Sequence, residues 1–376
     1  MSLTVCLAAS TIEYPEGGGH LWVYLNWALG LRALGCQVVW LEGIDPEMPV
    51  HQVRALTSTL KSRLESYGLA ECVALYSWNG EPLPQTVTEK CLDIDAAGEA
   101  DLLLNLAYSI PSRLVKRFRR SALVDIDPGL LQLWMSEGLV NPARHDIYFT
   151  IGETVGKPAA RFPDCGLQWH YTPPAVFLPA WPMTRADSRA PFTTVSGWWE
   201  DWIEYQGENV NNDKRTSFLE HADLPLHTSA QLELALCLSA EDDGDRRFLE
   251  QRGWKIRDSW EVTSTPKQYR AYIQRSRGEF SCAKPSCMLL QNAWISDRTL
   301  CYLASGKPAV VQHTGPSSFL PDAEGLFRFR SLEDAARALN MVQSDYERQC
   351  MLARHLAEDY FDARKVVGSV LERAVA

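Results

Sequence analysis

Short apolar segments alternate with helical segments along this chain, and this alternation limits the possible folds more than any other feature. Residues 3–9 form an apolar run suited to a buried parallel strand. A loop follows, then a helical pattern over residues 21–34 that Gly35 ends, and then a second apolar run at 38–41. Strand, helix and parallel strand in this order form a βαβ unit, which begins a doubly wound sheet. The sequence therefore predicts an α/β protein.

The alternation continues through the first half of the chain and begins again in the second half. In the first half we expect helices at 46–67 and 111–119, and further strands at 102–106, 122–126, 147–150 and 167–172. In the second half we expect strands at 192–195, 232–238, 280–283, 309–312 and 326–329, and helices at 246–253, from Ser331 and throughout 345–376. No internal sequence repeat accompanies the two series, so the halves are predicted to share a fold without sharing sequence.

A proline-rich stretch separates the two series. Five prolines lie between residues 173 and 191, at positions 173, 174, 179, 182 and 191. A chain of 376 residues is also too long for one core, because single cores stop growing near about 250–300 residues. We therefore expect one domain over residues 1–180 and a second domain from residue 181.

The composition limits the partners and the location. The net charge of −10 argues against nucleic acid or an anionic membrane as the main partner. The N-terminus lacks the basic segment of a signal peptide, and no apolar run approaches the roughly 20 residues of a membrane span. The ten cysteines are scattered and form no CxxC pair. We expect reduced thiols in a cytoplasmic protein, without a disulfide or zinc framework.

The segment from Gly278 to Gly315 contains the clearest functional signal. Its strand-like beginning leads into an irregular loop, and a helical pattern then starts at Ser296 and ends at Gly306 and Pro308. Ser296 suits the N-cap position, and Asp297 suits the first turn. The start of a helix carries free backbone N–H groups and the positive end of the helix dipole, so it is a suitable site for a diphosphate.

Two cations and a glycine loop could contribute to such a site. Lys284 and Arg298 are close in sequence to the helix start and would neutralise an anion. The glycines at 17–19 join the first strand to the first helix, where α/β folds bind ligands, and they allow close approach to the main chain. This loop is not GxGxxG, so a nicotinamide cofactor is disfavoured.

The run LASGKPAVV, from Leu303 to Val311, resembles the donor domain of GT-B glycosyltransferases, which move a sugar from a nucleotide-sugar to an acceptor. The GGGH loop at 17–20 agrees with the resemblance. It implies two Rossmann-like doubly wound domains that face a cleft. The domain at 1–180 would bind the acceptor, the domain at 181–355 would bind the nucleotide-sugar, and a C-terminal helix at 356–376 would cross back to pack on the first domain. It also implies that the reaction needs no metal or other cofactor.

The resemblance also suggests where the donor and the acceptor bind. For the donor diphosphate, we expect contacts from Gly18, Gly19, Lys284, Ser296, Asp297 and Arg298. For the donor sugar, we expect contacts from the loop after the strand at 309–311, namely Gln312, His313, Thr314 and Gly315. Glu13 and Trp22 are expected to contact the acceptor. Each position also has an ordinary explanation, because strand-to-helix turns, surface ion pairs and core tryptophans are common.

In inverting enzymes of this kind, a histidine at the position of His20 deprotonates the acceptor hydroxyl, which suits a side chain that titrates near neutral pH. Asp125 and Asp127 follow a predicted strand and could orient His20 or contact the acceptor. Turn chemistry explains Asp127-Pro128-Gly129 equally well, and capping explains His20.

One departure from the family pattern leaves the mechanism open. Retaining enzymes of this fold carry two glutamates separated by seven residues, and this chain has Ala293 and Cys301 at those positions. The sequence therefore predicts a glycosyltransferase acting on a small-molecule acceptor such as a natural product. The alternatives are a nucleotide-sugar 2-epimerase and a non-catalytic nucleotide- or sugar-binding protein of the same fold. An NAD-dependent dehydrogenase is a more distant alternative.

Overall fold

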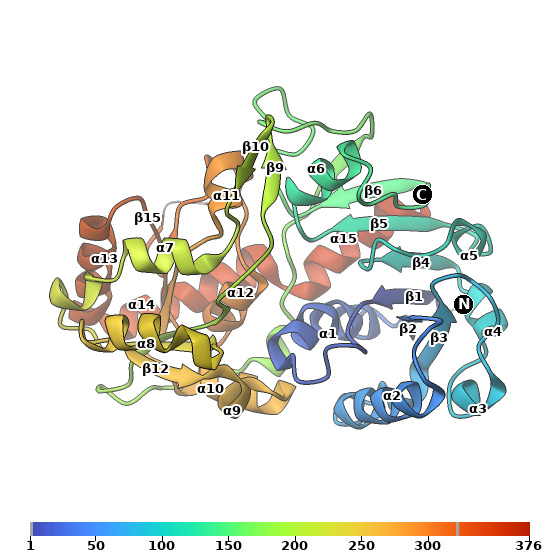
Figure 1. Ribbon diagram of the computed structural model, residues 1–376, viewed down its shortest axis with the longest axis horizontal. Coiled ribbons are helices and arrows are strands. Elements are labelled where there is room, and N and C mark those ends of the chain that lie inside the picture. The colour runs from blue at the N-terminus through green and yellow to red at the C-terminus, as the bar shows by residue number, and fades with distance from the viewer. Residues whose placement is uncertain (1–2, 321–322) are drawn as a thin grey trace. The chain divides into compact units, whose positions relative to one another are not determined.

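The computed structural model describes residues 3–320 and 323–376, and it divides into two compact units. Unit 1 contains the chain up to Pro158, residues Phe162–Phe177 and residues Ala363–Ala376. Unit 2 contains Ala159–Arg161 and Leu178–Asp362. Each unit is built around its own parallel sheet (Figure 1).

The sheet of unit 1 has seven strands in the order β3-β2-β1-β4-β5-β6-β7, and neighbouring strands are parallel. The strands are β1 (Thr4–Ala9), β2 (Gln37–Ile44), β3 (Val73–Ser77), β4 (Leu102–Asn105), β5 (Ser121–Asp125), β6 (Ile147–Thr150) and β7 (Trp169–Tyr171). Cys6 of β1 pairs with Val39 of β2 on one side and with Leu103 of β4 on the other. The winding therefore reverses between β1 and β4, and such a switch point is where doubly wound folds bind ligands.

Helices cover the sheet of unit 1. They are α1 (Gly18–Ala33), α2 (Val50–Glu65), α3 (Gln85–Thr88), α4 (Ile94–Gly98), α5 (Ser112–Val115), α6 (Leu130–Ser136) and, from the C-terminus, α15 (Ala363–Val375). Helices α1 and α15 pack closely, since a Cβ on Gly30 would lie 3.0 Å from the side chain of Ala363 and 3.1 Å from that of Val367. The end of the chain is thus part of the unit in which the chain begins.

The sheet of unit 2 has six strands in the order β12-β11-β8-β13-β14-β15, and neighbouring strands are again parallel. The strands are β8 (Phe192–Gly197), β11 (Leu232–Cys237), β12 (Lys255–Asp258), β13 (Gly278–Ser281), β14 (Ala309–Gln312) and β15 (Leu326–Phe329). An antiparallel hairpin of β9 (Ile203–Tyr205) and β10 (Glu208–Val210) follows β8. Its turn residues Gln206 and Gly207 both have positive φ, as a two-residue type I′ turn requires.

The helices of unit 2 surround an aromatic core. They are α7 (Lys214–Glu220), α8 (Asp243–Glu250), α9 (Ser259–Thr263), α10 (Pro266–Arg275), α11 (Pro285–Leu290), α12 (Asp297–Ala304), α13 (Leu332–Ser344) and α14 (Tyr346–Leu356). In the core, Phe280 of β13 stacks on Phe329 of β15 with ring centroids 5.4 Å apart. Trp254 and Phe218 contact the same Phe280 ring.

The proline-rich connector is fastened to unit 2 by hydrogen bonds to its carbonyl groups. Arg354 Nη1 donates to Trp181 O at 2.9 Å, and Lys307 Nζ donates to Thr184 O at 2.7 Å. The hydroxyl of Thr184 donates to Gln274 O at 2.9 Å. Lys307, the lysine of the LASGKP string, is fully buried, so it anchors the connector and does not face a ligand.

The C-terminal tail differs from the continuous helix expected over 345–376. Helix α14 is followed by a π-helical turn at Ala357–Phe361, and Asp362 then leaves the helical conformation with φ −56° and ψ 118°. Helix α15 starts only at Ala363, whose N–H donates to Val176 O at 2.9 Å. The periodic apolar pattern continues through this break, and for that reason the sequence did not indicate it.

Candidate functional site

The carboxyl ends of β8, β13 and β14 lie side by side in unit 2, and the loops that follow them form one edge of the sheet. These loops carry most of the residues predicted to bind the donor. Ser296 is the N-cap of α12, as predicted, and its hydroxyl accepts a hydrogen bond from Arg298 N at 3.3 Å. Asp297 is the first residue of the helix.

Arg298 was predicted to bind the diphosphate, but its guanidinium group is buried beneath this edge. Nε donates to Glu279 Oε1 at 2.7 Å, and Nη1 donates to Val195 O at 2.8 Å. Nη2 donates to the hydroxyl of Ser281 at 2.5 Å. Glu279 is fully buried, so this is an internal ion pair that joins α12 to β13 and β8. We therefore assign Arg298 to supporting the edge and not to direct ligand contact.

The loop predicted to bind the donor sugar packs against the loop that leads into α12. Thr314 Oγ1 donates to Trp294 O at 2.6 Å. Gly315 has φ 134°, and a Cβ at this position would lie 2.7 Å from the carbonyl oxygen of Gln291. Gln291 and Ala293 have positive φ themselves, with values of 52° and 56°. Strained backbone of this kind persists only where neighbours hold it, and it is common at functional sites.

Within the predicted sugar loop, the buried side chains bind the protein itself. His313 Nε2 accepts a hydrogen bond from Arg330 Nη2 at 2.7 Å, and both His313 and Thr314 are buried. Gln312 is partly exposed, and its Oε1 accepts a hydrogen bond from Ala283 N at 3.0 Å. We expected His313 and Thr314 to present their side chains to a sugar, and this has to be corrected. Both side chains are buried and form hydrogen bonds within the protein that stabilise the loop.

Two further lysines provide positive charge at this edge, and neither belongs to the buried Arg298–Glu279 pair. Lys284 Nζ lies 2.6 Å from Glu200 Oε2. Lys214 begins α7, directly after Asp213, whose carboxylate caps that helix by accepting a hydrogen bond from Thr216 N at 2.8 Å. The Lys214 ammonium lies 5.9 Å from the centroid of the Trp294 ring. Within residues 3–320 and 323–376, Lys214 forms no ion pair.

The pKa of Lys214 is lowered to about 7, first by burial and then by the positive charges of Arg298 and Lys284. A lysine with a lowered pKa among other cations is a place where a bound anion would be strongly favoured. Sequence analysis missed Lys214 because the β9–β10 hairpin separates it from β8. A signal was nevertheless present in the sequence. Asp213 suits a helix N-cap, Lys214 follows it directly, and both come soon after β8, the first strand of the second half.

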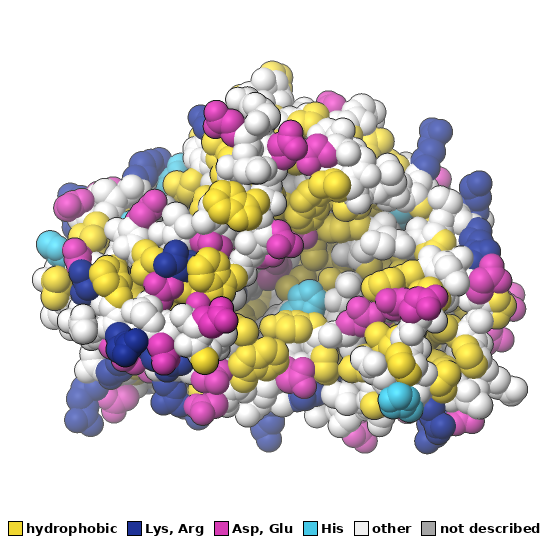
Figure 2. All heavy atoms as spheres, viewed as in Figure 1, with side chains coloured by type: hydrophobic (Ala, Val, Ile, Leu, Met, Phe, Trp, Pro, Cys, Tyr) yellow, Lys and Arg dark blue, Asp and Glu magenta, His cyan; other side chains and the backbone are white. Residues whose placement is uncertain are grey.

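Exposed tryptophans lie next to this cationic edge. Trp199 is 57% exposed and Trp202 is 64% exposed. The indole N–H of Trp199 donates to Asp242 Oδ1 at 2.7 Å, and the Arg215 guanidinium lies 4.9 Å from its ring centroid. On this side of the molecule, hydrophobic side chains are visible over the region of β10, α7 and α8 (Figure 2). Trp199 is therefore a fixed aromatic surface.

In unit 1, His20 lies in the first helical turn beside the switch point. Its Nε2 lies 2.6 Å from Ser10 O, just after β1. A carbonyl oxygen can only accept, so Nε2 carries the proton and Nδ1 is the basic nitrogen. The rings of Tyr14 and Tyr24 lie edge-on to the imidazole, with centroids 5.8 Å and 5.4 Å away. The ring is partly exposed and fixed in orientation.

The predicted glycine loop is partly helical. Gly17 is the N-cap of α1, and Gly18 and Gly19 are its first two residues. A Cβ on Gly17 would lie 2.1 Å from the Tyr14 ring, so a larger residue there would have to displace that ring. Gly18 and Gly19 belong to unit 1, whereas the other residues predicted to bind the diphosphate belong to unit 2.

Asp125 was predicted to act in catalysis, but it is fully buried and holds secondary structure together. Its Oδ2 accepts hydrogen bonds from Gln132 Nε2 at 2.9 Å and from Thr150 Oγ1 at 2.7 Å. Its Oδ1 accepts from Asp127 N at 3.0 Å. Burial and the charge of Asp127 raise the pKa of Asp125 to about 7, although the two side-chain hydrogen bonds oppose the shift. Asp125 therefore joins β5, β6 and α6.

Asp127 lies nearer than Asp125 to the switch point between β1 and β4, because its hydrogen-bond partner Tyr108 is in the loop after β4. The Tyr108 hydroxyl donates to Asp127 Oδ2 at 3.2 Å and accepts from Ile126 N at 2.8 Å. Tyr108 has φ 58°, an unusual conformation for a bulky residue. Tyr108 and Asp127 thus bring together the loops after β4 and β5.

The two residues predicted to bind the acceptor have different environments. Glu13 is exposed and lines a small pocket of about 50 Å³ at the carboxyl ends of β1 and β2, and burial and the charge of Asp45 raise its pKa. Trp22 is only 1% exposed and packs edge-on against Tyr67 at 5.3 Å. The prediction for Trp22 is therefore wrong, since a core tryptophan does not reach an acceptor.

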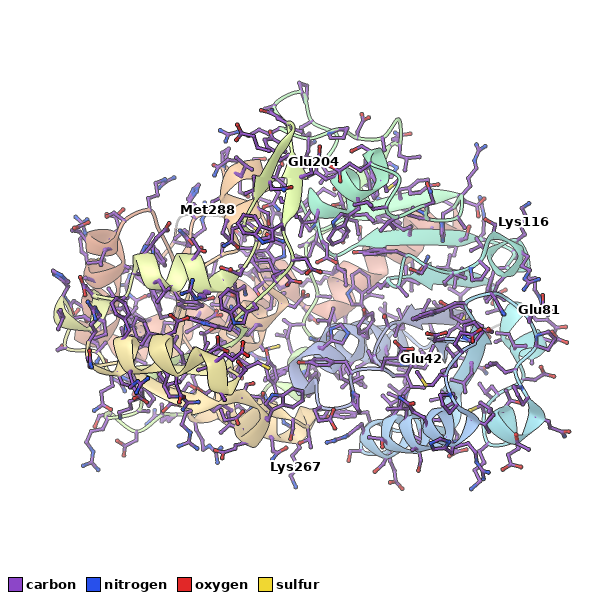
Figure 3. The ribbon with its side chains drawn as sticks, in the orientation of Figure 1. Glu42, Glu81, Lys116, Glu204, Lys267 and Met288 are labelled. Atoms are coloured by element: carbon purple, nitrogen blue, oxygen red, sulfur yellow. The ribbon has the colours of Figure 1, made fainter. Side chains whose placement is uncertain are left out.

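The same pocket contains Glu42, which sequence analysis did not select. Glu42 is fully buried in β2 (labelled in Figure 3) and accepts hydrogen bonds from Thr11 N and from the Thr11 hydroxyl. It also accepts from Trp40 Nε1 at 2.8 Å and from Ile12 N at 3.3 Å. Burial raises its pKa, and these hydrogen bonds oppose the rise. An acidic residue within the apolar run VVWLEGI was the available signal.

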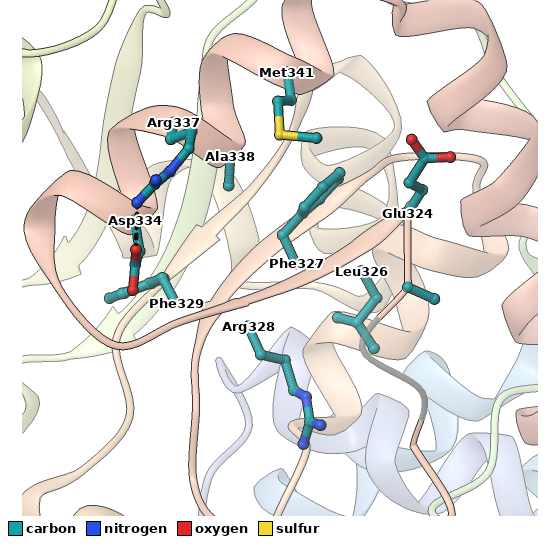
Figure 4. Close-up of a pocket in the computed structure, with 10 residues that line it drawn as sticks. Glu324, Leu326, Phe327, Arg328, Phe329, Asp334, Arg337, Ala338 and Met341 are labelled. Carbon is teal, nitrogen blue, oxygen red and sulfur yellow. Dashed lines mark hydrogen bonds and ion pairs between the residues drawn. The ribbon is translucent and has the colours of Figure 1, made fainter.

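A larger hollow of about 300 Å³ lies between β15 and α13 in unit 2 (Figure 4). Phe327, Arg328 and Met341 line it, and Arg337 Nη2 pairs with Asp334 Oδ1 at 2.6 Å beside them. This hollow runs along β15, the edge strand of the sheet, and none of the residues predicted to bind the donor line it.

The described part of the chain contains neither a metal-site cluster nor a membrane span. Over residues 3–320 and 323–376, no group of three or more His, Cys, Asp or Glu side chains is arranged to hold a metal ion. Over the same residues, every helix is too short or too polar to cross a bilayer.

Comparisons with known proteins were informative only at the level of structure. No protein-family model and no curated protein matches this sequence. An alpha-glucosyltransferase in complex with UDP-glucose and DNA containing an abasic site matches with a TM-score of 0.61 and 13% identity, covering 100% of both chains. Anabaena Alr3699/HepE in complex with UDP and glucose matches with a TM-score of 0.56 and 13% identity, covering 99% of both chains.

A third solved structure is similar over nearly the whole chain. AviGT4, a glycosyltransferase involved in Avilamycin A biosynthesis, matches with a TM-score of 0.52 and 14% identity, covering 99% of this chain and 97% of its own. All three matches span the whole chain and include both parallel sheets. The chain has the GT-B glycosyltransferase fold. The fold class expected from the sequence is therefore confirmed, with a doubly wound sheet in each half of the GT-B chain.

Proposed function

We propose that this chain is a glycosyltransferase that moves a sugar from a UDP-sugar to a hydroxyl of a small-molecule acceptor, without a metal ion. Unit 2 binds the donor and unit 1 binds the acceptor. The observation that carries the proposal is the pair Lys214 and Lys284 at the carboxyl edge of β8 and β13, where Lys214 has no anionic partner within residues 3–320 and 323–376 and has a lowered pKa. A diphosphate carries enough negative charge to neutralise both lysines.

In the proposed reaction, the acceptor oxygen attacks the anomeric carbon as the bond from that carbon to the diphosphate oxygen breaks. Negative charge develops on the leaving diphosphate, where protonated Lys214, Lys284 and the start of α12 at Ser296 stabilise it. His20 Nδ1 takes the proton of the acceptor hydroxyl, while Nε2 stays bound to Ser10 O. This is an inverting reaction, and it agrees with the absence of carboxylates at Ala293 and Cys301.

The donor assignment is supported by two of the similar structures, which were solved with UDP-glucose or with UDP and glucose. One of them also contains DNA. We nevertheless propose a small-molecule acceptor for this chain, because a net charge of −10 would repel a nucleic-acid backbone. Glu13 is the proposed acceptor contact. We also propose that the enzyme is cytoplasmic, since its ten cysteines are free thiols.

The first test is thermal unfolding with UDP, TDP, GDP, ADP, their common sugar conjugates and NAD. A ligand present at 100 times its dissociation constant adds about 2.7 kcal/mol, which raises the midpoint by several degrees. We expect a selective increase with UDP and with one or more UDP-sugars. A well-folded sample whose midpoint responds to none of these nucleotides would overturn the proposal.

A non-catalytic UDP-sugar-binding protein is the second candidate. The observation in its favour is that Cys301, where retaining enzymes have a glutamate, is buried in α12. Release of UDP from a bound UDP-sugar distinguishes the candidates. UDP release that requires an acceptor indicates a transferase, and release without an acceptor indicates a hydrolase. Conversion to an epimeric UDP-sugar without net UDP release indicates an epimerase, and binding without any reaction indicates the non-catalytic protein.

A further inference from the structure

The segment directly after β8 presents a carboxylate to the cationic edge of unit 2. Glu200 Oε2 lies 2.6 Å from Lys284 Nζ, and the two side chains are 46% and 27% exposed. Within residues 3–320 and 323–376, this is the only ion pair that either residue forms. The Glu200 carboxylate thus occupies the position beside Lys284 that an anionic ligand would need in order to contact this lysine.

The residues before Glu200 fix its backbone. The indole N–H of Trp198 donates to Asp245 Oδ2 at 3.0 Å, and that of Trp199 donates to Asp242 Oδ1 at 2.7 Å. Arg215 binds Asp245 through two nitrogens, at 2.5 Å and 3.0 Å. Most surface ion pairs contribute little because two flexible side chains must be ordered. Here the two residues before Glu200 are already held in place, so less of the chain has to be ordered when the pair forms.

The charges at this edge do not balance. Arg298 is neutralised by Glu279, and Lys284 is paired with Glu200. Lys214 is the remaining cation, and its pKa of about 7 reflects burial and the nearby positive charges. A single phosphate that pairs with Lys214 alone would leave the Glu200–Lys284 ion pair intact. A diphosphate that bridges both lysines has to displace Glu200.

We infer that Glu200 is a displaceable internal anion that competes with the nucleotide diphosphate for Lys284 and so limits how tightly the product UDP is held. The inference rests on the proposed function. When UDP occupies the edge, Glu200 turns to solvent, and when UDP leaves, the carboxylate returns to Lys284. The competition weakens UDP binding and speeds its release. It has little effect on UMP, which lacks the second phosphate.

The test measures dissociation constants of UDP and UMP by titration calorimetry for the wild type, Glu200→Gln and Glu204→Gln. Glu204 (labelled in Figure 3) is the matched control, because it is an exposed glutamate on β9 in the same segment and its substitution changes the charge equally. For Glu200→Gln we expect UDP to bind roughly three- to tenfold more tightly, the range that ion-pair free energies allow. UMP should change by less than about twofold by the same reasoning, and Glu204→Gln should leave both constants unchanged.

Three results would overturn the inference while leaving the proposed function intact. Glu200→Gln could bind UDP no more tightly than Glu204→Gln does, it could bind UDP more weakly, or it could gain as much for UMP as for UDP. The last result would indicate a general field effect. Failure of the wild type to bind UDP would overturn the proposed function and the inference together. Glu200→Asp, which keeps the charge but shortens the reach, should give a smaller gain than Glu200→Gln.

Discussion

At the scale of single residues, burial decides which charged groups can act on a ligand. Arg298 and Lys214 are both cations at the carboxyl edge of unit 2, yet Arg298 is committed to Glu279 and Lys214 has no such partner among the described residues. Sequence proximity to the Ser296 helix start suggested Arg298, because sequence distance says nothing about which way a side chain is buried. Lys214 comes close to the same edge only through the fold of the hairpin between β8 and α7.

Under the proposed function, the lowered pKa of Lys214 should make UDP binding depend on pH. Lys214 has to be protonated to bind the diphosphate, and its pKa of about 7 means that the protonated fraction falls above neutrality. The affinity for UDP should therefore decrease as pH rises from 7 to 9, by up to about tenfold for each pH unit. Titration calorimetry at several pH values measures this. Lys214→Arg, which stays charged, should flatten the profile, and a flat profile in the wild type would contradict the assignment.

His20 is expected to act on the acceptor and not on the donor. His20→Ala should abolish sugar transfer while leaving the dissociation constant of UDP within about twofold of wild type, because the proposed diphosphate contacts are in unit 2. UDP release in the presence of acceptor, together with calorimetry, measures the two effects. Unchanged turnover in this variant would rule out His20 as the general base.

Asp125 is expected to matter for stability, since three donors converge on its carboxylate. Asp125→Asn places an NH₂ group against at least one of them, so the free energy of unfolding should fall by about 1–3 kcal/mol. The native pKa of about 7 lies above the ordinary value of 3.8. Asp125 therefore contributes stability that is fully present below about pH 4 and is lost as pH rises through 7.

Urea unfolding between pH 4 and pH 8 tests both statements. The wild type should lose stability relative to Asp125→Asn across this range, and the difference should be smallest at the alkaline end. A variant as stable as the wild type at every pH would show that these hydrogen bonds contribute nothing.

At the scale of secondary-structure elements, most apolar strands were predictable, but the apolar and fully buried strand β3 was not, and neither was the polar β9–β10 hairpin. Strands such as β1 and β14 are continuous apolar runs in the sequence and were located to within a residue or two. The β9–β10 hairpin was missed because its residues are mostly polar and its two strands pair only with each other. The strained turn at Gln291 and Ala293 could not be predicted either, since it depends on Gly315 and Thr314 from a loop about 20 residues away.

The contact between these two loops can be tested by substituting Gly315. A Cβ there meets Gln291 backbone at 2.7 Å and needs φ 134°, so Gly315→Ala should be strongly destabilising. Gly138→Ala is the control, because Gly138 also has positive φ, at 72°, but a Cβ there meets no atom within 4 Å. The control should lose about 1–2 kcal/mol from backbone strain alone. Denaturant unfolding compares them, and equal losses would show that the close approach has no energetic role.

At the scale of the whole molecule, the βα alternation was sufficient to predict two doubly wound sheets, because each strand and helix is a local pattern. The course of the C-terminal tail was less predictable. Its helical periodicity hides the break at Asp362, and only tertiary contacts show that α15 packs on α1 through Gly30.

Removing residues 363–376 should therefore destabilise unit 1 selectively. Without α15, the apolar face of α1 around Gly30 is exposed to water, which favours unfolding of that unit. Limited proteolysis followed by mass spectrometry should show early cleavage within residues 3–177 and continued protection of residues 178–362. Equal protection of both units, or loss of both together, would contradict this assignment.

The hydrogen bonds of the proline-rich connector determine where this chain can be recombined with another chain of the same fold. Trp181 and Thr184 are bound to unit 2, and Ala363 is bound to Val176 in unit 1. Apart from the short segment Ala159–Arg161, which belongs to unit 2, the chain therefore changes units at 177–178 and at 362–363. A chimera that exchanges acceptor specificity with another protein of this fold should therefore be spliced at both places. The gene fragment encoding the N-terminal half has to be accompanied by the final 14 codons, because the helix they encode belongs to the transplanted half.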